Sequence, residues 1–204
     1  MPGDELLNRL SRIYAAIDSV FEDDLTKFPP TVVEDENRVV IRQDFKGGLS
    51  DAEIENLAQS VIANIASFRN HLRIWAARND HDRNRVDQAF SESLALQVIT
   101  DLWNAFNHSG PPRNRGYSAK APRLLEVNRV FRFSGGDGPR SVVVLSSPGA
   151  LPPTMSVSSS GSTGIVITGK VVGSDGAFIG DLHKLEVEAI EAWEQVLGEF
   201  EILT

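Results

Sequence analysis

The core of this protein is predicted around the stretch Ser93-Leu-Ala-Leu-Gln-Val-Ile-Thr-Asp-Leu-Trp-Asn-Ala-Phe-Asn-His108. Apolar side chains recur in it at helical spacing, with Ile99 and Trp103 beside the main row: Leu94, Val98, Leu102 and Phe106. A second row is polar: Gln97, Asp101, Asn104 and His108. One apolar and one polar row predict an amphipathic helix from about 93 to 108, capped by Ser91 or Ser93, with its apolar face in the core.

The segment after this helix is a basic loop. Gly110 suits a helix end, and Pro111-Pro112 cannot continue a helix. No acidic residue lies between Asp101 and Glu126, whereas one tyrosine and four cations do: Arg113, Arg115, Tyr117, Lys120 and Arg123. Cations bind phosphate and an aromatic ring stacks on a base, so these five are candidate nucleotide or nucleic-acid contacts. The alternative is a basic loop docked on the acidic ends of the same chain.

Three groups of the polar row are candidate catalytic residues. Asp101, Asn104 and His108 share one stripe of the predicted helix, and a carboxylate can orient a histidine for acid–base work. The alternative is a solvated polar row, with His108 as a cation at the carboxyl end of the helix.

Further helices are predicted on both sides of the central one. They span about 5–22, 51–77 and 182–199, with a short helical turn over 86–90. Ser50 and Glu53 have the spacing of a capping box. The last helix should expose its glutamates and bury six residues: Leu185, Ala189, Ile190, Trp193, Val196 and Leu197. We expect the helices at 51–77 and 93–108 to pack antiparallel, with Phe68 and Trp75 also buried.

Strands are predicted where the apolar period changes to two. A hairpin joins 31–33 to 38–42, longer strands span 123–133 and 165–172, and a Ser/Gly-rich loop covers 156–164. Shorter strands are expected at 142–145 and, after a turn, at 177–179. One face of the 123–133 strand should carry Leu125, Val127, Phe131 and Phe133.

The fold class that follows is α+β, a helical bundle with a small antiparallel sheet and a closing C-terminal helix. We divide the chain into an N-terminal helix and hairpin, 1–48, and a core of helices, sheet and last helix, 49–204. Together they should form one compact unit.

Composition excludes several classes of site. The 204 residues include no cysteine, which excludes thiol catalysis and thiolate metal sites and fits a reducing cytoplasm. The four histidines form no metal-binding motif, and no apolar run approaches the roughly 18 residues of a membrane span. We therefore expect no metal, no cofactor and no membrane. The net charge is −8, yet residues 61–140 hold 12 basic and 7 acidic side chains, so an anion site or charge complementarity within the chain is expected there.

Asn104-Ala-Phe-Asn-His108 resembles the latter part of the Arg-Asn-x-x-x-His motif of HEPN domains, many of which are bacterial RNases in toxin–antitoxin and phage-defence systems. The resemblance covers about residues 50–108 and carries over only Asn104 and His108. The family's arginine stands with four to six residues between it and the histidine. This chain has Asp101, Leu102 and Trp103 there. The resemblance thus implies a helical scaffold and an RNA context without catalysis.

Two hypotheses follow. The first is a non-catalytic HEPN-like module that binds nucleic acid, a protein partner or a second copy of itself through the helix end at His108 and the loop. The second is a nuclease or nucleotide-using enzyme with Asp101, Asn104 and His108 in its site and Arg113 or Arg115 on the phosphate. The missing arginine favours the first.

Overall fold

The computed structural model describes residues 4–18, 29, 31–35, 38–42, 48–108, 115–133, 142–146, 154–158 and 163–203. Its helices are α1 (Asp4–Asp18), α2 (Asp51–Arg78), α3 (Arg83–Glu92), α4 (Leu94–Asn107) and α5 (Leu182–Glu199). Its strands are β1 (Thr31–Asp35), β2 (Arg38–Arg42), β3 (Arg123–Phe133), β4 (Val142–Ser146), β5 (Thr154–Ser158), β6 (Thr163–Val172) and β7 (Phe178–Asp181). The predicted α+β class with a C-terminal helix is confirmed.

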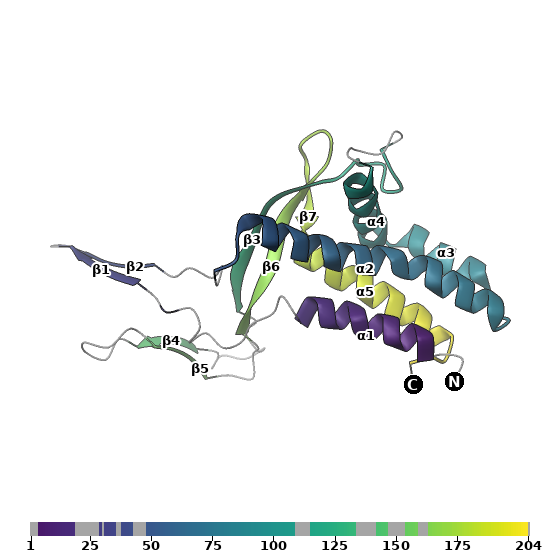
Figure 1. Cartoon of the computed structure of the whole chain (residues 1–204), viewed down its shortest axis with the longest axis horizontal. Coiled ribbons are helices and arrows are strands. Elements are labelled where there is room, and N and C mark those ends of the chain that lie inside the picture. The colour runs from purple at the N-terminus through teal and green to yellow at the C-terminus, as the bar shows by residue number, and fades with distance from the viewer. Residues whose placement is uncertain are drawn as a thin grey trace.

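The helices form a body around one apolar core. α1, α2 and α5 lie side by side, and the three-stranded sheet stands at the end of the body where α2 and α5 begin (Figure 1). The Tyr14 hydroxyl donates to the Glu194 carboxylate and so ties α1 to α5. The largest fully buried side chains include Trp193 of α5 and Phe68 of α2, which contact each other in the middle of this core.

Local side-chain caps explain where the helices begin. The predicted capping box is present at α2, where Ser50 accepts from the Glu53 N–H and Glu53 accepts from the Ser50 N–H. Ser93 caps α4 as predicted, by accepting from the Leu96 N–H. α3 is longer than the predicted turn at 86–90, because Asp82 caps it and starts it at Arg83.

The predicted antiparallel packing of α2 and α4 is wrong. α4 runs across α2 (Figure 1) and also contacts α5. Where two helices cross, only part of each helix lies in the contact. Val98 and Leu102 are accordingly buried, whereas Leu94 is 46% exposed and Phe106 is only partly buried, against our expectation for both.

The sheet has the order β3-β6-β7 with antiparallel neighbours, so the predicted hairpin after β6 is confirmed. β3 has a bulge between Leu125 and Asn128, where Glu126 adopts φ 53°. The bulge changes which side chains share a face. Leu124 and Val127 pack against the core, whereas Leu125 is 44% exposed. The prediction that Leu125 and Val127 share one face of the strand is therefore wrong.

Two separate antiparallel ribbons complete the strands, β1-β2 and β4-β5. The first is the predicted hairpin. The second contains the predicted strand at 142–145, but its partner β5 overlaps the stretch that we expected to be a loop, 156–164. That stretch lacks the apolar alternation from which a strand is predicted, and pairing with β4 orders part of it.

α5 buries all six residues that its period predicts. Three of its glutamates are exposed as predicted, Glu188, Glu191 and Glu199, but Glu194 is partly buried and Glu186 is only 4% exposed, so the expectation fails for these two. Glu186 follows Leu185 on the side of the helix that faces the core. Among the described residues, none of the helices combines the length and the apolar composition of a membrane span.

Candidate functional site: a loop anchored on α4

The site is built on Asp101, a fully buried carboxylate in the middle of α4. Its Oδ1 accepts the Tyr117 N–H at 2.8 Å, and its Oδ2 accepts the Ser118 N–H at 2.9 Å and the Ser118 hydroxyl at 2.7 Å. A buried carboxylate is tolerated when such donors replace its water. Asp101 therefore holds the loop of residues 115–121 against the helix.

Gly116 allows the loop to approach this closely. Its φ is +73°, and a Cβ built on it would stand 2.2 Å from Oδ1 of Asp101. Only glycine combines that backbone conformation with that space. The loop closes on itself where the Ala121 N–H donates to the Arg115 carbonyl at 2.9 Å.

The anchored loop brings Tyr117 into a group of four side chains that we name the Arg69 cluster: Arg69, Asp87, Phe90 and Tyr117. The Tyr117 ring meets Phe90 edge-on at 5.1 Å between centroids, and Tyr117 remains 56% exposed. The Arg69 guanidinium lies 3.8 Å over the Phe90 ring, 5.7 Å from the Tyr117 ring, and donates to Asp87 at 2.7 Å. Ring contact and ion pair together orient this arginine.

The three candidate catalytic residues differ in burial and in their hydrogen-bond partners. All the hydrogen bonds of the Asp101 carboxylate go to the loop. His108 is exposed and is the C-cap residue of α4, with its backbone N–H donating to the Asn104 carbonyl at 3.0 Å. Seven helical positions correspond to about 10 Å, so His108 lies two turns beyond Asp101. Asn104 is partly buried one turn beyond Asp101. The loop thus brings Tyr117 and Ser118 to Asp101, and Asp101 does not orient His108.

The cations of the loop face solvent. Arg115, Lys120 and Arg123 are exposed, and Arg113 lies outside the described residues. Within the segments that the structure describes, none of the three exposed cations forms an ion pair. The described acidic residues therefore do not hold this loop by ion pairs.

Five members of the site were not predicted: Arg69, Asp87, Phe90, Gly116 and Ser118. Arg69 and Phe90 lie on predicted helices, where they count as an ordinary polar and an ordinary apolar position. The one local signal is Gly116-Tyr-Ser118, a glycine before an aromatic residue and a hydroxyl in a short loop. No group of three or more potential metal ligands is found among the described residues.

Comparison with known proteins gave no match, neither to a family model nor to a curated protein or a solved structure. The HEPN resemblance therefore stays a prediction from the residues quoted above.

Proposed function

We propose that this protein is a non-catalytic, HEPN-like binding module that takes up single-stranded nucleic acid on its anchored loop. RNA is the ligand that the resemblance implies, and bacterial toxin–antitoxin or phage defence is the corresponding setting. The observation that carries the proposal is the state of Asp101. Its carboxylate is buried and fully engaged in displaying Tyr117 and the cations, so it supports binding rather than proton transfer.

The displayed groups match the two recurring features of a nucleic-acid strand. An exposed tyrosine ring stacks on a base, which contributes about 1–3 kcal/mol per base and tolerates any sequence. Arg115, Lys120 and Arg123 are exposed cations for the phosphates on either side of that ring. The pre-ordered loop also lowers the entropy that binding must otherwise overcome.

The test is binding of a fluorescent oligouridine over a series of salt concentrations. Tyr117→Ala should weaken binding by about tenfold or more, because it removes a stacking ring. Tyr117→Phe keeps the ring and should bind like the wild type. Changing Arg113 and Arg115 to Ala should lower the slope of log affinity against log salt by about 0.7 for each phosphate contact that is lost.

Lys184→Ala is the control for lost positive charge, because Lys184 is exposed on α5, belongs to neither the loop nor the Arg69 cluster, and its ammonium lies 3.7 Å from the Glu188 carboxylate. This variant should leave the slope unchanged. Absence of binding to RNA and DNA at low salt would refute the proposed function.

A further inference from the structure

A groove on the outer face of α2, at the start of α3, has the composition of a second anion site. It has a volume of about 470 Å³ and is lined by Asn70, Arg73, Ile74, Ala77, Arg78 and Arg83. Ile74, 49% exposed, supplies apolar surface together with Ala77, while three guanidinium groups surround them. Apolar surface beside several cations suits a base and its phosphates.

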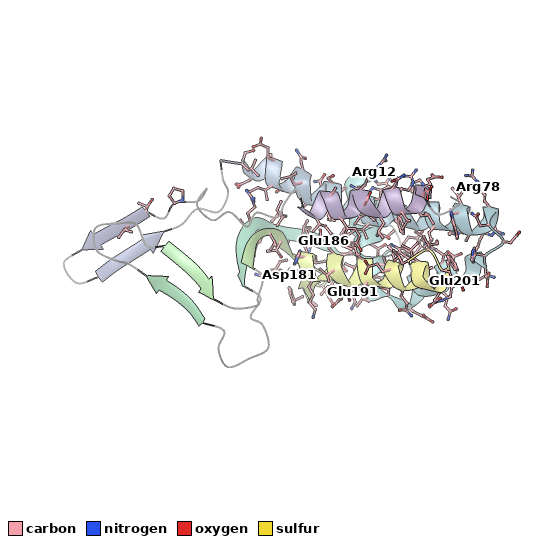
Figure 2. The ribbon with its side chains drawn as sticks, turned by 90° about the horizontal axis from the view of Figure 1, so that it is seen from below. Arg12, Arg78, Asp181, Glu186, Glu191 and Glu201 are labelled. Carbon is pink, nitrogen blue, oxygen red and sulfur yellow. The ribbon has the colours of Figure 1, made fainter. Side chains whose placement is uncertain are left out.

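Two of the three arginines of this groove are exposed to solvent, while the third, Arg73, pairs with Asp87. Arg78 and Arg83 are exposed, and neither forms an ion pair with any residue that the structure describes. The nearby Asp82 is used as the cap of α3, where it accepts the Asn84 N–H at 2.9 Å. Arg78 lies at the end of α2 far from the sheet, and the labelled acids Glu191 and Glu201 lie on the opposite edge of the helical body (Figure 2).

The groove is continuous with the Arg69 cluster through Asp87. One oxygen of this carboxylate accepts from Arg69 at 2.7 Å, and the other lies 3.4 Å from Nε of Arg73, which lines the groove. From Arg69 to Arg78, α2 advances about 13 Å, at a rise of about 1.5 Å per residue. Asp87 therefore links two arginines, Arg69 beside Tyr117 and Arg73 at the edge of the groove that Arg78 and Arg83 also line.

We propose that a single strand of nucleic acid bound at the loop continues along this groove, with its phosphates on Arg73, Arg78 and Arg83. This inference rests on the proposed function. It extends that function by specifying how far the bound strand reaches and in which direction it runs from the loop. Asp87 then positions Arg69 and Arg73 at the junction of the two parts. A free mononucleotide would fill only one part of this site, whereas a strand fills both.

The experiment measures binding of oligouridines of increasing length by the wild type, Arg78→Ala, Arg83→Ala, Arg115→Ala and the control Lys184→Ala. With a long strand, Arg78→Ala and Arg83→Ala should each lower the salt slope by about 0.7, as should Arg115→Ala, while the control does not. The gain in affinity with strand length should be smaller in the two groove variants than in the wild type. All four substituted side chains are exposed or peripheral, so the variants should fold.

Two results overturn the inference in distinguishable ways. If the groove variants match Lys184→Ala on the long strand while Arg115→Ala still lowers the slope, the loop binds nucleic acid and the groove does not. If the wild type binds no oligonucleotide of any length at low salt, the groove and the proposed function fail together.

Discussion

At the scale of single residues, Asp101 is the group on which the site depends, since all three of its hydrogen bonds go to the loop. We predict that Asp101→Asn lowers the free energy of unfolding by about 1–3 kcal/mol, because the amide presents a donor where the loop also presents donors. Urea unfolding measures this loss. Ser118→Ala removes only one of the three hydrogen bonds and should lower the free energy of unfolding by less than Asp101→Asn does. Equal stability of wild type and Asp101→Asn would show that the loop does not need the carboxylate.

Gly116 provides a second test of the anchored loop. Gly116→Ala should displace the loop and destabilise the protein, because the new Cβ would overlap the Asp101 carboxylate. The control is Gly176→Ala, since Gly176 has φ +79° and a Cβ placed there would meet no atom within 4 Å, so this variant shares only the backbone strain. Thermal unfolding of both variants isolates the overlap. A Gly116→Ala protein as stable as Gly176→Ala would contradict the close approach.

His108 is the residue on which an RNase activity would depend. We predict no metal-independent RNA cleavage that is lost in His108→Ala. The HEPN motif pairs its histidine with an arginine, and loss of such a charge donor lowers rates by roughly 10²–10³, by analogy with oxyanion-hole groups. Here the buried Asp101 stands at one of the positions where that arginine belongs. The assay incubates a mixed RNA pool with wild type or His108→Ala in the absence of metal and measures RNA cleavage. Cleavage by the wild type alone would favour the enzyme hypothesis.

At the scale of elements, the crossing of α4 divides its apolar stripe into buried and exposed parts. We predict that Val98→Asp unfolds the protein, because Val98 is fully buried and an unpaired charge there costs several kcal/mol. Leu94→Asp is the matched control on the same stripe, and it should melt close to the wild type because Leu94 is 46% exposed. Melting curves followed by circular dichroism compare the stability of the two variants with that of the wild type. A soluble Val98→Asp protein with a cooperative melt would place the stripe outside the core.

At the scale of the whole molecule, α5 closes the core with a buried acid. Burial, and then the charge of Asp181, raise the pKa of Glu186 from 4.5 to about 8. His183 Nδ1 lies 3.9 Å from the Glu186 carboxylate, too far for a hydrogen bond that would offset the cost of burying a charge. Folded protein therefore keeps this proton to about pH 8, whereas the unfolded chain releases it near its ordinary value.

Stability should accordingly fall as pH rises through this window. The contribution of Glu186 is full below about pH 4.5 and is lost progressively up to about pH 8, with a limit on the order of 5 kcal/mol. We predict that Glu186→Gln flattens this dependence and is more stable than the wild type at pH 9. Urea unfolding at pH 5, 7 and 9 measures both proteins. Parallel pH profiles would show that Glu186 is ionised in the folded state.

Much of this fold follows from local patterns in the chain. The apolar period places α2, α4 and α5, and serine and glutamate spacing gives the start of α2, because helix formation and capping involve residues within a few positions of each other. The period of two places β3 and β6 for the same reason. These predictions are confirmed by the structure.

Contacts between distant residues decide the rest. Helical spacing put Asp101 in a polar row with His108, whereas packing buried it and brought Tyr117 and Ser118 to it from the loop. Arg69 and Tyr117 belong to elements that no local pattern relates, and Leu125 turned outward at a bulge that has no apolar period. Periodicity specifies which face of an element is apolar, but the angle at which elements pack decides which polar groups are enclosed and which remain available to a ligand.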